Sequence, residues 1–397
     1  MRKGISFVKK IKVIFDYTVL SLKLGLILGV LIALYLNSIT IMEKIRTSHL
    51  WIIFFLPIVG VFFLRLYDKY QIHTDRLIDE RVTTALSFKR LVITTTGTIF
   101  SHLVGASIGR ENTANRMSED VVEIIANQDK KNTWYINQLY YIAMAAALAG
   151  TFGVPLAAIV LYFERQHWKV KDKGLIYTAC VTCLLIYICG VIFKVPYPKF
   201  QVPLFHLTTK TGLAIPIVVI LSLSLGLLFR ICLAKWSQVR VSLQISAAWW
   251  LVLNSFLVLI LVVVLHNTSY LGVSSQMQTL AVAGQISFFA FFWKLLLTMF
   301  CLSSRFQGGM ITPAIDISLA FGASLAYIYP SSASYLAGMM MVGVLTVLSK
   351  APLTSIVMGI TFFNISYLLP FAVVAYCVHF VNQQPSIFVP KKLSINE

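Results

Sequence analysis

Glu111 is an acidic residue that closely follows an apolar run over residues 88–108, directly after Gly109 and Arg110. An ionisable side chain at the centre of a bilayer costs about 2.5–3.5 kcal/mol on insertion scales, so it needs a compensating environment. The first turn of a helix provides one, because its unpaired N–H groups carry partial positive charge and bind anions. We therefore interpret Glu111 as an intramembrane carboxylate that competes with an anion for a helix start. The alternative is a structural Arg110–Glu111 pair at a membrane interface.

Two kinds of sequence pattern each occur twice in the chain. Residues 105–113 read GASIGRENT and residues 308–313 read GGMITP, and both are typical of a glycine-rich helix start. Residues 153–160 read GVPLAAIV and residues 350–357 read KAPLTSIV, with Pro-Leu and Ile-Val at the same spacing. The order and offset of both pairs predict two duplicated halves. Duplicated halves with broken helices are typical of transporters, whose substrate site lies between the repeats.

The second glycine-rich turn has the features of another anion-binding helix start. Gly309 allows the backbone to approach an ion closely. Pro313 suits an early helical position, where its missing N–H group costs nothing. We therefore expect an anion to be held by backbone amides that come from both halves.

The composition is that of a protein embedded in a membrane. Hydrophobic residues make up 58% of the 397 residues, charged residues only 12%, and the mean hydropathy is +0.81. Soluble domains carry about 25% charged residues. At about 20 residues per span, the chain has room for about ten or more membrane-embedded helices. Several apolar runs are short or interrupted by Gly and Pro, which favours half-spanning helices covered by protein.

The charge distribution indicates the orientation of the chain. The formal net charge is +18, with basic residues gathered between Arg2 and Lys12 and at Lys391–Lys392. Positive residues stay on the cytoplasmic side, so both termini are expected there, with an even number of crossings between them. Nucleic-acid binding is not expected, because no soluble basic domain is evident.

Three motifs resemble those of the CLC family of chloride channels and anion/proton exchangers. Gly109–Thr113 (GRENT) is similar to the family's G-R-E-G-P motif, and Gly309–Pro313 (GMITP) is similar to its G-x-F-x-P motif. Thr151–Ala158 (TFGVPLAA), followed by Glu164, resembles the P-L-A-G segment and its downstream glutamate. The motifs agree in order and spacing, and the resemblance covers residues 15–390.

The resemblance implies an all-α, polytopic membrane protein with a CLC-like inverted repeat of two halves and with tilted and half-spanning helices. Residues 1–397 would form a single transmembrane domain, with residues 15–200 as the first half and residues 210–390 as the second. It also implies a homodimer with one pore per subunit. A cytoplasmic regulatory domain is not expected.

By the same resemblance, Glu111 is the gating glutamate and Glu164 is a candidate for a proton path. The anion site is expected to include Gly109, Arg110, Asn112, Gly309, Met310, Ile311 and Phe388. Phe388 is the nearest counterpart of the family's central tyrosine, but it lacks the hydroxyl that would donate to the anion. The stretch His73–Glu80 lies where the family has a serine segment and cannot be aligned with it residue by residue.

Some substitutions bear on the branch of the family. Thr113 replaces the usual proline, and together with Ser101–Leu103 and Thr312 it is similar to the fluoride/proton antiporter branch. That branch has glutamate where Met310 stands, and chloride/proton exchangers have a second, inner glutamate where Arg165 stands. Both differences weaken the case for proton coupling, while chloride and fluoride remain equally open as substrates.

Other polar and aromatic residues are interpreted as structural. His102, nine residues before Glu111, is expected to pack or hydrogen bond, with a proton relay as the alternative. Asp316 is expected at a structural or interfacial place, since an acid near an anion site repels the substrate; a place in the ion path is the alternative. Phe288–Trp293 is expected to face lipid or a dimer interface. A solvated acidic face is expected for Glu119, Asp120, Glu123 and Asp129.

The sequence therefore predicts a channel or exchanger for a small inorganic anion, chloride or fluoride, gated by Glu111 and located in the cell membrane. Halide ions, the lipid bilayer and a second copy of the chain are the expected partners, with protons as a further one. The alternatives are an inverted-repeat transporter for another anion and a degenerate relative that does not transport. A membrane enzyme using His102 and Glu111 is disfavoured, because no paired acid and base is evident. Neither a cofactor nor a metal is expected.

Overall fold

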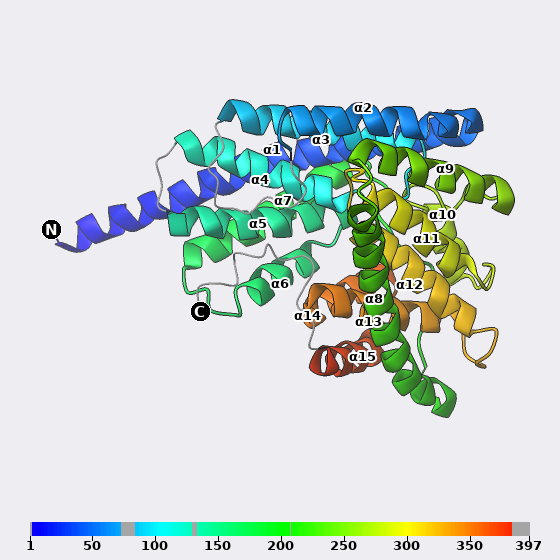
Figure 1. Cartoon of the computed structure of the whole chain (residues 1–397). Coiled ribbons are helices and arrows are strands. Elements are labelled where there is room, and N and C mark those ends of the chain that lie inside the picture. The colour runs from blue at the N-terminus through cyan, green and yellow to red at the C-terminus, as the bar shows by residue number, and fades with distance from the viewer. Residues whose placement is uncertain (1, 73–83, 129–132, 207, 383–397) are drawn as a thin grey trace. The chain divides into compact units, whose positions relative to one another are not determined.

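The computed structural model describes residues 2–72, 84–128, 133–206 and 208–382 (Figure 1). These residues form fifteen α-helices and two short 3₁₀ helices, and within the described ranges there is no strand. The only β-type pairing there is an isolated bridge between Gly109 and Gly309. The all-α prediction is therefore confirmed. The chain divides into two compact units, and helices α1, α3 and α4 contribute to both.

The first unit contains residues 1–37, 82–91 and 114–197. Its helices, complete or in part, are α1 (Arg2–Ser48), α3 (Thr84–Leu103), α4 (Glu111–Gln128), α5 (Thr133–Phe152), α6 (Pro155–Arg165) and α7 (Lys173–Ile192). Helix α1 packs closely on α7 through glycines. A Cβ atom on Gly25 would lie 2.8 Å from the Leu185 side chain, and one on Gly29 would lie 2.7 Å from the Cys189 sulfur. Small residues at such crossings are typical of membrane helices.

The second unit contains residues 38–81, 92–113 and 198–397. Besides parts of α1, α3 and α4, its elements are η1 (Leu50–Phe55), α2 (Leu56–Lys69), α8 (Thr209–Ser242), α9 (Ala247–Leu265), α10 (Ser275–Val282), α11 (Ala290–Ser303), α12 (Ile311–Leu325), α13 (Ala333–Ser349), α14 (Pro352–Phe362), η2 (Ile365–Tyr367) and α15 (Leu368–Val381).

Helix α13 forms the core of the second unit. Every residue from Ser334 to Leu348 is buried, and the helix packs against α8, α12, α14 and α15. A helix that is apolar on all sides must be enclosed by other helices or by lipid. Glycines allow the close approach here too: a Cβ on Gly226 would lie 2.6 Å from Val347, and one on Gly359 would lie 2.6 Å from Val342.

The helices have the lengths that a membrane protein requires. In the described part of the chain, five apolar segments are long enough to span a bilayer: Ile14–Ser48, Leu50–Lys69, Lys173–Ile192, Thr209–Ser242 and Ala247–Leu265. Five further apolar helices have only 10–17 residues: Ala290–Ser303, Ile311–Leu325, Ala333–Ser349, Pro352–Phe362 and Ile365–Val381. A helix rises 1.5 Å per residue, so the shorter ones do not cross about 30 Å of hydrocarbon alone. This mixture of long and short helices agrees with the predicted half-spanning elements.

The repeated Pro-Leu segments adopt the same local structure. Helices α6 and α14 each have eleven residues and begin at a proline. The preceding residues, Val154 and Ala351, have nearly equal φ angles of −120° and −122°, because proline keeps its predecessor out of the helical region. One position earlier, Gly153 (φ +69°) and Lys350 (φ +59°) are both left-handed. The backbone pattern therefore recurs although the residue types differ.

Candidate anion site at two helix starts

The two glycine-rich turns meet through their backbones. The Gly109 N–H group donates to the Gly309 carbonyl oxygen at 2.8 Å, and the Gly309 N–H group donates to the Gly109 carbonyl oxygen at 2.7 Å. Glu111 is the first residue of α4, and Ile311 is the first residue of α12. Both turns belong to the second unit. This reciprocal pair of hydrogen bonds brings the two helix starts together, as the internal repeat predicts.

The Glu111 side chain caps α12. Its Oε1 atom accepts a hydrogen bond from the Ile311 N–H group at 2.5 Å, and its Oε2 atom accepts one from the Thr312 hydroxyl at 2.8 Å. The residue at the N-cap position of α12, Met310, provides no side-chain cap. Only 6% of Glu111 is exposed. A buried carboxylate thus occupies the N-terminal end of α12, a helix about 200 residues further along the sequence. The N-terminal end of a helix is the end that favours anions.

The glycines of both turns leave the space that this carboxylate occupies. A Cβ atom on Gly309 would overlap the Glu111 carboxylate, and one on Gly109 would lie 2.6 Å from Glu111 Oε1. A Cβ on Gly308 would lie 2.8 Å from the Gly109 carbonyl oxygen. Any larger residue would therefore fill the space that the carboxylate uses.

Hydroxyl and amide groups hold the two turns around the carboxylate. The Thr98 hydroxyl lies 2.7 Å from the Thr113 hydroxyl and donates to the Gln307 carbonyl oxygen at 3.0 Å. The Asn112 side-chain amide donates to the Gly308 carbonyl oxygen at 3.3 Å. These groups are contributed by α3, by the start of α4 and by the turn before α12. Their hydrogen bonds fix the positions of the helix starts on which the site depends.

Comparison with known proteins decides the family. The family model described as voltage gated chloride channel matches residues 69–383 of the chain. This protein belongs to the CLC family. A curated relative named chloride/fluoride channel protein, from Pseudomonas syringae pv. tomato, is 24% identical over 358 residues, which are 86% of this chain and 78% of the relative.

Solved structures of CLC proteins share the fold. A CLC-type fluoride/proton antiporter superimposes with a TM-score of 0.84 at 23% identity, covering 95% of this chain and 98% of that chain. A slow cyanobacterial Cl⁻/H⁺ antiporter superimposes with a TM-score of 0.80 at 19% identity, covering 92% of this chain and 94% of that one. The CLC-type arrangement of helices is therefore confirmed, and the chain is a membrane protein of a family of anion channels and exchangers.

Most residues of the predicted CLC-type anion site lie at the two glycine-rich turns. Gly109, Gly309, Ile311 and Glu111 come together, and Arg110 beside them is buried. Asn112 and Met310 are partly buried at the same turns, whereas Phe388 and the stretch His73–Glu80 lie outside the described residues. That these residues bind an anion, and that Glu111 is a gate, stay predictions at this point.

Thr312 was missing from the predicted set, although its hydroxyl holds the Glu111 carboxylate. In the sequence, Thr312 is notable as a marker of a branch of the family. A hydroxyl in the first turn of a helix whose backbone amides are expected to bind an anion is itself a candidate donor. That signal was present in the sequence.

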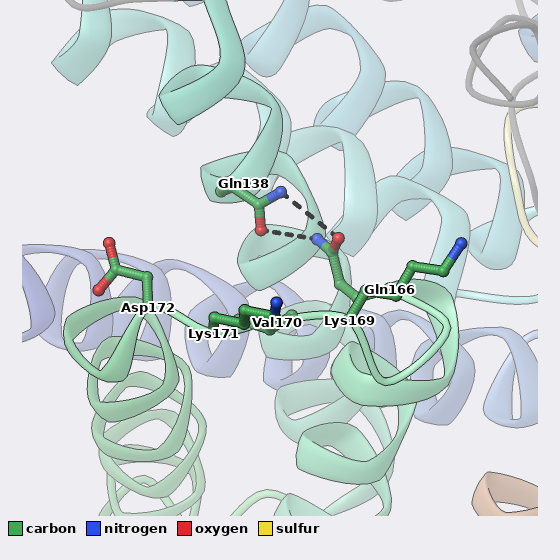
Figure 2. A pocket seen from close by; sticks show the side chains of 6 residues that line it. All are labelled: Gln138, Gln166, Lys169, Val170, Lys171 and Asp172. Atoms are coloured by element: carbon green, nitrogen blue, oxygen red, sulfur yellow. Dashed lines mark hydrogen bonds between the residues drawn. The ribbon is translucent and has the colours of Figure 1, made fainter.

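Glu164, the candidate for a proton path, lies in α6 of the first unit and is partly buried. A cavity of about 570 Å³ in that unit is lined by Gln138, Gln166, Lys169, Val170, Lys171 and Asp172 (Figure 2). Figure 2 shows the side-chain amides of Gln138 and Gln166 facing each other, and they form two hydrogen bonds of 2.8 Å and 3.4 Å. Asp172 caps α7 by accepting hydrogen bonds from Gly174 and Leu175. Most of the lining residues are polar, and the Gln166 N–H group donates to the Glu164 carbonyl oxygen at the end of α6.

The prediction of a solvated acidic face on α4 is wrong. Asp120 is completely buried, and Arg90 of α3 donates to it at 2.6 Å and to Glu123 at 3.1 Å. Tyr140 of α5 also donates to Glu123, at 3.1 Å. Glu119 accepts a hydrogen bond from Asn115 and is only partly exposed, while Asp129 lies outside the described residues. Buried acids are tolerated here because a guanidinium and neutral donors surround them.

His102 and Asp316 are both fully buried. The His102 ring lies with its Nδ1 atom 3.5 Å from Glu43 Oε1, and the His102 carbonyl oxygen accepts a hydrogen bond from Arg46. Asp316 lies 3.2 Å from Lys294 inside the second unit. This buried ion pair agrees with the structural interpretation of Asp316, and a place in the ion path stays the alternative. The aromatic residues Phe288, Phe289 and Phe292 are exposed, as expected for a surface that faces lipid.

Proposed function

We propose that this CLC protein carries chloride or fluoride across the cell membrane and that Glu111 is its gate. The observation that supports the proposal is the position of the Glu111 carboxylate, which caps the first turn of α12 and is buried. A halide ion needs the same donors as a carboxylate oxygen: a backbone N–H group, a hydroxyl and the positive end of a helix. Carboxylate and halide therefore exclude each other.

The proposed gate works by competition. In the resting state Glu111 accepts hydrogen bonds from the Ile311 N–H group and the Thr312 hydroxyl, and no halide can reach these donors. A halide that arrives with sufficient affinity displaces the carboxylate, which moves aside as an anion or after taking up a proton. A protonated carboxyl group loses the charge-assisted part of both hydrogen bonds, so protonation favours the open state. When the halide leaves, the carboxylate returns to the start of α12.

The curated relative is named for both chloride and fluoride, and the Thr312 hydroxyl bears on the choice between them. Replacing Thr312 by valine keeps the shape of the side chain and removes the donor. In a Glu111→Gln background, where no carboxylate loses the same donor, halide binding should weaken roughly tenfold or more, because a hydrogen bond to a charged group is worth about 1.5–3 kcal/mol. Fluoride should be affected more than chloride, since it is the smaller ion and the stronger acceptor. Titration calorimetry with both halides measures the change.

Thr312→Ser is the matched control for this prediction, because it retains the hydroxyl. In the same background it should bind both halides nearly as tightly as Glu111→Gln. Equal affinities of Thr312→Val and Thr312→Ser for both ions would show that the hydroxyl does not contact the transported anion.

Reconstitution tests the function itself. Liposomes containing the purified protein are loaded with chloride or fluoride, and efflux is recorded with halide-selective electrodes while a pH electrode follows protons. We expect halide efflux well above that of protein-free liposomes. Uptake of labelled organic anions is measured in parallel. Efflux of neither halide, together with uptake of an organic anion, would replace this proposal by transport of a larger substrate.

We also infer a homodimer in the cell membrane with both termini on the cytoplasmic side. Exposed apolar side chains on α7 and α15, such as Leu184, Ile188 and Leu369, support a surface covered by lipid or by a second copy. The clustered basic residues near both termini support the orientation. Chemical crosslinking in native membranes tests the dimer, and protease protection of terminal tags in sealed vesicles tests the orientation.

A further inference from the structure

A buried ion pair lies next to the proposed gate and takes no part in it. Lys294 of α11 and Asp316 of α12 are both 0% exposed, and the Lys294 Nζ atom is 3.2 Å from Asp316 Oδ2. Gln278 of α10 donates from Nε2 to the other carboxylate oxygen, Oδ1, at 2.6 Å. Charged groups at such depth are costly and mark functional sites in membrane proteins by default.

The hydrogen bonds of Lys294 are directed elsewhere. Its Nζ atom donates to the carbonyl oxygens of Tyr270 and Gly272, both at 3.0 Å, and to the Ser274 hydroxyl at 2.6 Å. An ammonium group has three N–H donors, so these three acceptors use all of them. Asp316 Oδ2 accordingly accepts no hydrogen bond from the described residues, although a positive charge lies beside it. This oxygen is therefore a buried acceptor held by the charge of Lys294 alone.

The helix geometry relates Asp316 to the gate. Thr312 donates to Glu111, and Asp316 follows Thr312 by four positions on α12. Residues four apart lie on the same face of a helix, about one turn from each other. Asp316 is also close enough to Glu111 for their charges to interact. Any negative charge at the start of α12, whether carboxylate or halide, is thus felt by Asp316.

Among the described residues, three groups act most strongly on Asp316. Helix α11 contributes Lys294, α10 contributes the neutral Gln278, and the start of α4 contributes Glu111. Helix α13, which packs on α12, has no acidic or basic residue between Ala333 and Ser349. Around Lys294 the further groups are Glu43 and the thiol of Cys301. The electrostatic state next to the anion site therefore depends mainly on Asp316, Lys294 and Glu111.

We infer that Asp316 takes up a proton when a halide enters the site at the start of α12, so that anion and proton binding are linked. The inference rests on the proposed function. Ionised Asp316 neutralises Lys294 and repels an anion one helical turn away. When an O–H bond forms at Oδ2 with a proton from water, the Lys294 charge is no longer compensated and attracts the anion. The linkage is reciprocal: bound halide favours the proton, and the proton favours halide.

Proton uptake on halide binding tests the inference in a Glu111→Gln background, which removes the gate's own proton. Detergent-solubilised protein is titrated with fluoride, and separately with chloride, in weakly buffered solution containing a pH indicator. We expect protons to be taken up with the halide by Glu111→Gln and none to be taken up by Glu111→Gln/Asp316→Asn. At neutral pH the double variant should bind halide about tenfold more tightly than Glu111→Gln, because no carboxylate beside Lys294 then compensates its charge.

Two results would overturn the inference alone: halide binding by Glu111→Gln without proton uptake, or equal proton uptake after Asp316→Asn is added. Failure of Glu111→Gln to bind either halide would overturn the proposed function and this inference with it. If Asp316→Asn alone does not fold, the triple variant Glu111→Gln/Asp316→Asn/Lys294→Met removes both charges. This triple variant should bind halide without taking up protons, and its affinity should not show the tenfold gain. Proton uptake by the triple variant would also contradict the inference.

Discussion

Glu111→Gln should bind halide roughly 10- to 150-fold more tightly than the parent protein. The carboxylate makes two hydrogen bonds to the start of α12, to Ile311 and Thr312. A hydrogen bond to a charged group is worth about 1.5–3 kcal/mol, and the neutral amide loses most of that advantage. The competitor for the anion site becomes weaker, so the apparent affinity for the halide rises. Isothermal titration with chloride and fluoride measures the change.

The same variant should change halide flux in liposomes while remaining folded. Asp16→Asn is the matched control, since it also neutralises one carboxylate, but on an exposed position of α1. It should leave affinity and flux unchanged. If Glu111→Gln binds halide no more tightly than Asp16→Asn and transports at the same rate, Glu111 is not the gate.

Arg90→Met should lower the free energy of unfolding by about 3–5 kcal/mol. Arg90 donates to Asp120 and Glu123, and Asp120 is completely buried. Methionine has a similar length but no charge, so the two carboxylates would be left without their guanidinium in a site that excludes water. Denaturant unfolding in detergent micelles, followed by tryptophan fluorescence, measures the loss.

Arg305→Met is the control for this prediction. Arg305 forms a 3.0 Å ion pair with Asp68, but the Asp68 side chain is 55% exposed. Pairs exposed in this way contribute about 0–1 kcal/mol, so the control should be close to the parent in stability. Similar losses for both variants would mean that the Arg90 cluster is hydrated rather than buried.

The sequence predicts the elements of the anion site because its chemistry is local. Gly109 and Glu111 lie together in one turn, Gly309 and Ile311 lie together in another, and the recurrence of the pattern indicates that the turns belong to equivalent helix starts. The proline-led helices α6 and α14 are predictable for the same reason, because proline restricts its own φ angle and that of its predecessor.

Contacts between distant helices were harder to predict. The acids on α4 were expected to face solvent, because nothing within α4 indicates that Arg90 will lie against Asp120. Lys294 stands inside an apolar run and was not singled out, although a lone basic residue in such a run indicates a buried counter-charge. The partner, Asp316, is on the next helix, and only the packing of α11 on α12 brings the two together.

The reciprocal hydrogen bonds between Gly109 and Gly309 have a mechanical consequence. Two backbone hydrogen bonds in opposite directions join the two helix starts, so neither helix start can move away from the other without breaking both bonds. A cycle that opened the pathway by separating the turns would need a slow collective rearrangement, on the microsecond to millisecond scale. Rotation of the Glu111 carboxylate about its own side-chain bonds leaves these two hydrogen bonds intact. Turnover through such a pathway would then be paced by the arrival and departure of ions, with the surrounding scaffold nearly stationary.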